Sequence, residues 1–74
     1  MWIVELGQIG RAGQPNTRTL SRNVSPSRRD AERIAEKLLV ERGVQSDVAA
    51  RMAKIADKWT DDFPTRTTVR IFEE

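Results

Sequence analysis

The most apolar strand predicted from the sequence is Trp2-Ile3-Val4-Glu5-Leu6. It is rich in β-branched and aromatic residues, which favour strands. Alternation places Trp2, Val4 and Leu6 on one face, and Ile3 makes the other face partly apolar. We therefore expect this strand at the centre of a sheet, with its Trp2/Val4/Leu6 face covered by helices.

A second strand is predicted over residues 17–24, after a loop rich in glycine over residues 7–16. Alternation puts Arg18 and Arg22 on the same face as the apolar residues of this strand, which is a conflict. An edge position or a bulge would resolve it, because arginine stems can lie on apolar side chains while their charged heads reach water.

The first of two predicted helices begins near Ser27. Ser27 lies three residues before Asp30, a spacing typical of a capping box, and Ser25 before Pro26 offers an alternative cap. Gly43 is expected to end the helix in the left-handed conformation. The apolar residues at helical spacing are Ala31, Ile34, Ala35, Leu38 and Leu39.

The second helix is predicted to be capped by Ser46, with Phe63 just past its end and Pro64 preventing its continuation. We expect Trp59 and Phe63 to belong to the core. The predicted apolar stripe consists of Val48, Met52, Ile55, Ala56 and Trp59.

A third strand over residues 65–73 completes the prediction. The chain is then a single domain over residues 1–74, of the α+β class. It has a three-stranded sheet with two helices packed on one face, in the order β-β-α-α-β. Counting chain reversals makes the third strand parallel to the first.

The composition of the 74-residue chain excludes several kinds of site. It contains no cysteine and no histidine, so disulfides, thiol nucleophiles, imidazole bases and thiolate zinc sites are ruled out. So short a chain also has little volume for a pocket beside its core. We predict a protein that is not an enzyme and holds no cofactor or metal. Its apolar runs are too short for a membrane span or a signal segment, so we expect a cytoplasmic protein without membrane contact.

Positive charge is concentrated in the first third of the chain. Residues 1–29 carry five arginines against Glu5, whereas residues 30–62 carry a net charge of −2. Arginine forks suit phosphate, and a two-stranded ribbon can enter a DNA groove, so this basic group indicates nucleic-acid binding as one alternative. Arginines are also common on solvated surfaces, and no aromatic residues interleave with these. The group consists of Arg11, Arg18, Arg22, Arg28 and Arg29.

A second candidate site is the sheet face turned away from the helices. Ile3 is expected there beside Glu5, with Arg70 and Phe72 added from the last strand. An apolar pair with an adjacent arginine is typical of the centre of a protein contact. Scattered surface hydrophobic residues would give the same pattern.

Three carboxylates, Asp57, Asp61 and Asp62, lie at the end of the predicted second helix. Asp57 and Asp61 are four residues apart and would share a helical face, where a hard cation could bind. Lys54 and Lys58 lie beside them, which favours a solvated surface of ion pairs instead.

The short first strand, the polar strand Thr17-Arg18-Thr19-Leu20 and a helix over residues 27–35 resemble small β-β-α-β proteins of phages and mobile elements. Several of these are anti-CRISPR inhibitors. Residues 2–35 also resemble the arm-type DNA-binding domain of phage tyrosine integrases, although no third strand precedes the first helix here. Each resemblance covers about half of the chain.

The function expected from the sequence is non-enzymatic binding. The first resemblance implies a phage-type inhibitor that binds a larger protein or ribonucleoprotein and blocks its nucleic-acid-binding or effector surface in the host cytoplasm. It would act as a monomer or homodimer. A DNA- or RNA-binding module that uses the basic group is the alternative, and a structural protein of a phage particle is a third possibility. The net charge of +2 argues against an acidic mimic of DNA.

Overall fold

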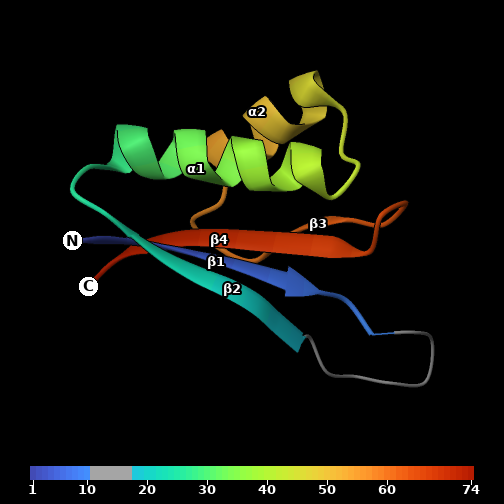
Figure 1. Ribbon diagram of the computed structural model, residues 1–74, viewed down its shortest axis with the longest axis horizontal. Helices are drawn as coiled ribbons and strands as arrows, with labels where there is room; N and C mark the ends of the chain where they lie inside the picture. Colours follow the sequence, from blue (N-terminus) through green and yellow to red (C-terminus); the bar gives the residue numbers. More distant parts are fainter. Residues whose placement is uncertain (11–17) are drawn as a thin grey trace.

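In the computed structural model, which describes residues 1–10 and 18–74, two helices cover one face of a four-stranded antiparallel sheet (Figure 1). The sheet order is β2-β1-β4-β3. The α+β class and the two helices are as predicted, but the three-stranded sheet and the order β-β-α-α-β are wrong. The elements are β1 (Trp2–Gln8), β2 (Arg18–Ser25), α1 (Arg28–Glu41), α2 (Ser46–Lys54), β3 (Thr60–Asp62) and β4 (Thr67–Glu73).

The strand missed by the sequence analysis is β3, and its presence reverses the direction of β4. The chain leaves α2 after Lys54, forms β3 and returns as β4, with Thr60 paired to Val69 and Asp62 to Thr67. This hairpin adds one reversal, so β4 runs antiparallel to β1 and the predicted parallel arrangement is wrong.

A tight turn closes the β3–β4 hairpin. The N–H of Arg66 donates to the carbonyl of Phe63 at 3.1 Å, which leaves Pro64 at the second position of the turn, where proline is favoured. The carboxylate of Asp62 accepts hydrogen bonds from the backbone N–H of Thr65 at 3.2 Å and from its hydroxyl at 2.6 Å. Pro64 therefore belongs to a hairpin turn and not to the end of a helix.

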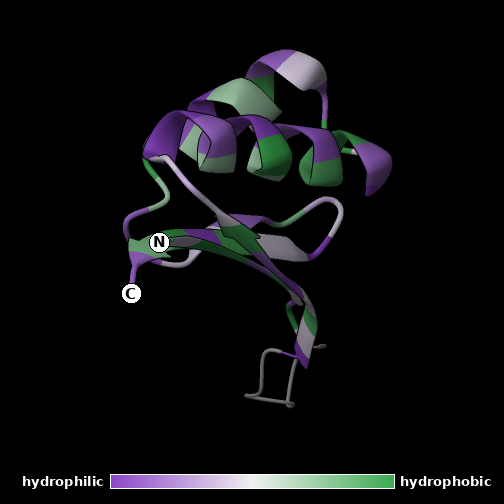
Figure 2. Cartoon of the chain, turned by 60° about the vertical axis from the view of Figure 1, so that its left-hand side comes forward, coloured by the Kyte–Doolittle hydropathy of each residue, from purple (hydrophilic) through white to green (hydrophobic). Residues whose placement is uncertain are grey.

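The core lies between the sheet and the helices, and Figure 2 shows the apolar side of α1 facing the sheet. Val4 and Leu6 of β1 point into it, as alternation predicts. Alanines dominate the contributions of both helices, which allows a close approach between them and to the sheet. The buried cluster consists of Val4, Leu6, Ala31, Ala35, Leu39, Val44, Ala49, Met52, Ala53, Ala56, Val69 and Ile71.

Both ends of α1 form as predicted. The hydroxyl of Ser27 accepts the N–H of Asp30 at 3.1 Å. Gly43 has φ of 99°, its N–H donates to Val40, and the N–H of Val44 donates to Leu39. These two bonds define a Schellman motif, which satisfies carbonyls at the helix end.

The start of α2 differs from the prediction. Gln45 is the N-cap, with its carbonyl accepting the N–H of Ala49 at 2.8 Å, and no side chain caps the helix. Ser46 is the first helical residue and not the cap.

The end of α2 also differs, and it changes the core. Because the helix stops at Lys54, Ile55 and Trp59 do not continue the buried helical stripe that contains Met52. Trp59 is 37% exposed and Phe63 is 72% exposed, so their assignment to the core is wrong. Met52 is buried as expected.

The sequence predicts arginines and apolar residues on one face of β2, and it suggests an edge position or a bulge to accommodate them. The structure shows both features. β2 is an edge strand of the sheet, and its pairing with β1 shifts register between Leu6 and Gly7. Most of its side chains are exposed.

Candidate interaction surface

The sheet face turned away from the helices, here called the open face, is built from cross-strand neighbours. Directly opposed residues of an antiparallel pair point to the same face of a sheet. Ile3 is opposed by Val24 on one side and by Phe72 on the other. The next row of side chains consists of Arg22, Glu5 and Arg70, since Glu5 is opposed by both arginines.

The first row of the open face is apolar. Ile3 is only 3% exposed although no part of the helical layer covers it, because Val24 and Phe72 flank it from the neighbouring strands. Val24 is 54% exposed and forms the outer end of the row on β2. This row supplies apolar area that a partner can cover.

The second row is organised around Arg70. Its Nε and Nη2 donate to Oε1 of Glu5 at 2.9 and 2.6 Å. Its guanidinium carbon lies 4.7 Å from the ring centre of Trp59 and 4.7 Å from that of Phe72, within range of cation–π attraction. Trp59, Arg70 and Phe72 are called the arginine–aromatic cluster below. Their geometry is held by Glu5, whose side chain is only 13% exposed.

A shallow hollow of about 410 Å³ lies beside the apolar row, at the end of β2. An exposed ion pair between Arg22 and Glu74 stands on its rim. Such pairs contribute little to stability and exchange readily with other charges. The hollow is lined by Met1, Ile3, Arg22, Val24 and Glu74.

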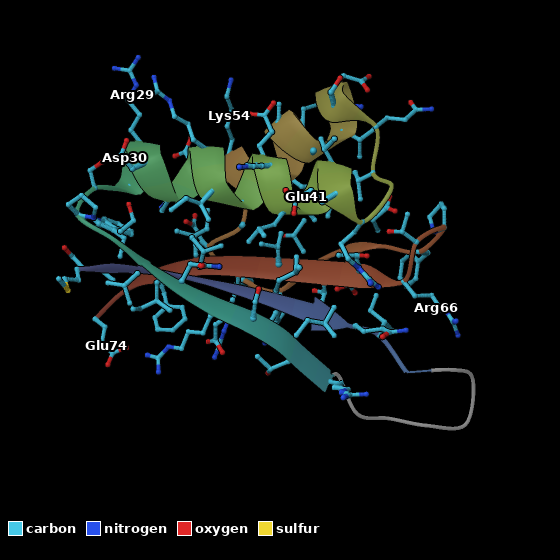
Figure 3. All side chains as sticks on the ribbon, viewed as in Figure 1. Arg29, Asp30, Glu41, Lys54, Arg66 and Glu74 are labelled. Atoms are coloured by element: carbon cyan, nitrogen blue, oxygen red, sulfur yellow. The ribbon has the colours of Figure 1, made fainter. Side chains whose placement is uncertain are left out.

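The predicted basic group does not come together in space. Arg11 lies outside the described residues. Arg18 and Arg22 are exposed on β2, whereas Arg29 projects from α1 away from the sheet (Figure 3). The clustering of these arginines along the chain therefore does not produce one basic surface among the residues described.

Arg28 is engaged in contacts within the molecule. Its Nη2 lies 2.7 Å from Oδ1 of Asp57, and its Nε lies 3.2 Å from Oε2 of Glu32. The hydrogen bond to Asp57 raises the pKa of Arg28 above its ordinary value, against the lowering effect of burial. The guanidinium also lies 5.5 Å from the ring centre of Trp2. Arg28 thus joins α1 to the end of α2.

The three aspartates near the end of α2 serve separate roles. Asp57 pairs with Arg28, Asp61 lies on β3, and Asp62 holds the hairpin turn through Thr65. The shared helical face predicted for Asp57 and Asp61 is wrong because the helix ends before them. Across residues 1–10 and 18–74, no three carboxylates gather in a way that could hold a metal ion.

Trp59 is the open-face residue that the sequence analysis misplaced. The turn residues around Pro64 could have indicated the position of Trp59, because they are typical of a hairpin. A hairpin centred there pairs Thr60 with Val69, which sets the preceding Trp59 beside Arg70.

Comparisons with known proteins give no relative: no family model, no curated protein and no solved structure matches this chain. Within the part of the chain that the structure describes, neither helix is long and apolar enough to cross a membrane.

Proposed function

We propose that this chain is a non-enzymatic binding domain that attaches to a larger protein or ribonucleoprotein through its open face. The arginine–aromatic cluster beside the apolar row carries the proposal. Tryptophan and arginine are the residues that most often dominate interface energies, and clusters of them gather near interface centres. Neither helix covers Trp59, Arg70 or Phe72, since both helices pack on the opposite face.

The cluster is ordered before any partner arrives. Glu5 fixes Arg70 through two hydrogen bonds, and two rings flank the guanidinium. Binding then costs less side-chain entropy than it would for a mobile arginine. A preorganised arginine of this kind favours the recognition of a defined protein surface.

The size of the domain fits inhibition by coverage. The described residues expose 4933 Å², and a standard interface takes about 800 Å² from each partner. One face of the domain is therefore sufficient for a stable contact that blocks a functional surface of the partner. Inhibition of the phage type, in the cytoplasm of a host, remains part of this proposal.

The charges of the open face favour a protein over nucleic acid. Arg70 is paired with Glu5, and Arg22 is paired with Glu74, so the two arginines of this face are balanced by two acids. Phosphate backbones require unbalanced positive charge. The nucleic-acid alternative would have to rest on Arg18 and on the rearrangement of Arg22.

The test is a comparison of three tagged baits in an extract of cells that express the protein. The baits are the wild-type chain, Trp59→Ala with Phe72→Ala, and Lys37→Ala on the exposed side of α1 as the matched control. We expect a partner that the wild-type chain and the control retain and that the double variant loses, with all three baits folded by circular dichroism. Equal retention by all three baits would show that the open face is not the binding surface.

A further inference from the structure

The outer edge of β2 presents backbone groups that the sheet does not use. Immediately outside the two ends of β1, the carbonyl of Met1 and the N–H of Ile9 both bond toward the β4 side, to Glu74 and Arg66. Backbone groups of successive residues in a strand point to alternate sides, so the odd residues of β1 bond to β4 and the even residues bond to β2.

The even residues of β1 are Trp2, Val4 and Leu6, and they are opposed by Ser25, Asn23 and Ser21. Those three residues of β2 therefore point their N–H and C=O groups inward. The intervening Arg22 and Val24 point theirs outward from the sheet. Among the residues that the structure describes, β2 pairs with β1 alone.

The two edges of the sheet are not equivalent. The β3 edge is three residues long and carries Asp61 and Asp62, which are features that protect an edge from pairing. The β2 edge is eight residues long and contains no proline, and its register shift lies outside residues 21–25, which pair regularly with β1. The β2 edge is thus the one that can accept another strand.

Of the two helices, α1 lies nearer to β2. It contacts β1 and β4 and, more sparsely, β2, whereas α2 contacts β4 on the far side. Arg28 is bonded to Asp57, which follows α2, and to Glu32 of its own helix. Arg28 and Glu32 therefore lie on the flank of α1 that faces α2. At about 100° per residue, Ile34 and Leu38 lie on the opposite flank, above β2.

Ile34 and Leu38 are only half-buried and pack against the margin of the core. On the helix side of β2 the neighbouring side chains are small and polar, namely Ser21 and Asn23. The hydroxyl of Ser21 is shielded from solvent and lacks a hydrogen-bond partner. A strand added beside β2 would direct every second side chain beneath Ile34 and Leu38.

The other side chains of an added strand would meet positive charge. On the open face β2 carries Arg22 and no acid, whereas Arg18, which is opposed to Gln8 beyond the register shift, falls on the other face. The partner of Arg22, Glu74, forms only an exposed pair that an incoming carboxylate can replace. Two β2 edges from two copies of this chain would bring the arginines of both copies together, which disfavours self-pairing.

We propose that the outer edge of β2 binds an extended segment of a partner protein as a fifth strand. That segment alternates apolar side chains, which enter beneath Ile34 and Leu38, with acidic side chains beside Arg22. Main-chain hydrogen bonds to Arg22 and Val24 supply affinity, and the alternation supplies specificity. The inference rests on the proposed function only in taking a protein as the partner.

The probe is the synthetic peptide acetyl-Thr-Ile-Glu-Ile-Glu-Ile-Thr-amide, and its control carries lysine in place of both glutamates. We expect the acidic peptide to bind the wild-type chain and to slow hydrogen exchange at the amides of Arg22 and Val24. We expect the lysine peptide not to bind. The proposal is overturned if the acidic peptide does not bind, if protection appears elsewhere, or if the chain instead self-associates through β2.

A pair of variants isolates the backbone contribution. Val24→Pro removes an N–H that β1 does not use, and proline is tolerated at such edge positions, whereas Val24→Ala keeps the N–H. Peptide binding is expected to weaken roughly tenfold in Val24→Pro relative to Val24→Ala, the equivalent of one net hydrogen bond. Equal binding by the two variants contradicts strand addition.

A further variant separates this edge from the open face. Trp59→Ala with Phe72→Ala is expected to bind the peptide as the wild-type chain does, because neither residue lies on β2. Peptide binding that is lost in this variant and retained in Val24→Pro would place the peptide on the open face and overturn the edge proposal. Hydrogen exchange in the wild-type chain locates the peptide independently of any variant, because slowed exchange at the amides of Arg22 and Val24 places it on the β2 edge.

Discussion

Arg70 and Glu5 face each other across β1 and β4, joined by two hydrogen bonds of 2.9 and 2.6 Å to a single carboxylate oxygen. The same guanidinium contacts the rings of Trp59 and Phe72. One side chain thus links Glu5 to two aromatic residues of the open face. The cluster depends on the planar, forked shape of arginine and not only on its charge.

Arg70→Lys tests this dependence. Lysine keeps the positive charge but cannot donate two bonds in the same plane or stack on the rings. We expect the free energy of unfolding to fall by about 1 kcal/mol, as measured by urea denaturation. Arg18→Lys at the exposed end of β2 is the matched control and should leave stability unchanged. Equal stabilities of the two variants would show that the cluster contributes charge alone.

Two neighbouring leucines of α1 test how the apolar stripe of this helix is oriented toward the core. Leu39 is fully buried in the core, whereas Leu38 is half-buried beside β2. Leu39→Ala is expected to cost about 2–5 kcal/mol, as truncations of buried leucines do. Leu38→Ala should cost clearly less, because part of its surface already meets water. The opposite ranking in thermal or urea unfolding would mean that α1 is rotated relative to the sheet.

The two helix starts give a test of capping. Ser27 accepts the N–H of Asp30, but Ser46 lies inside the first turn of α2 and makes no cap bond. Ser27→Ala is expected to destabilise the protein by about 1 kcal/mol. Ser46→Ala should change stability little, since no hydrogen bond is lost there. A larger loss for Ser46→Ala would restore the capping role that the sequence alone suggests.

Local signals were sufficient for much of the fold. Alternation located β1, β2 and β4, and the positions of Ser27 and Gly43 located both ends of α1, because these signals act within a few residues. The end of α2 is set differently. The carbonyl of Ala56 accepts the N–H of Ile71 from β4 at 2.7 Å, so a contact distant in sequence ends the helical region.

The same distant contact explains the missed strand. β3 is only three residues long, Thr60–Asp62, and has no apolar alternation. Apolar spacing from Met52 to Trp59 continues the helical pattern past the point where the helix stops. Periodicity alone therefore placed Trp59 in the core, when pairing with β4 carries it to the open face.

The open face was predicted better than the basic group, for a physical reason. Strand alternation placed Ile3, Arg70 and Phe72 on one face, because register follows from the side-chain period of two. The basic group was defined by nearness along the chain, which does not measure nearness in space. Arg28 and Arg29 belong to α1 and are separated from the arginines of β2 by the turn of the chain.

Binding to nucleic acid is the last prediction. Within the basic group, Arg28 is bonded to Asp57 and Glu32, and Arg22 is paired with Glu74. Of the four arginines of this group that the structure describes, this leaves Arg18 and Arg29 without an ion pair, and they lie on separate elements. Binding to duplex DNA requires several lysine or arginine contacts to phosphate and weakens as salt rises. We therefore expect no measurable binding to random duplex DNA at about 50 mM salt, where such contacts are strong. Fluorescence anisotropy provides the measurement.

The control for that experiment is the charge reversal Arg18→Glu with Arg22→Glu. If the wild-type chain does bind DNA, with an affinity that falls steeply with salt and disappears in this variant, then β2 is a nucleic-acid surface. The ion pair of Arg22 with Glu74 must then open to release its charge. If neither protein binds DNA while the wild-type chain binds the acidic peptide, the arginines of β2 serve to attract the carboxylates of a protein segment. Phosphates and carboxylates are both drawn to positive charge, and the shape and spacing of the charged groups then decide which of the two partners binds.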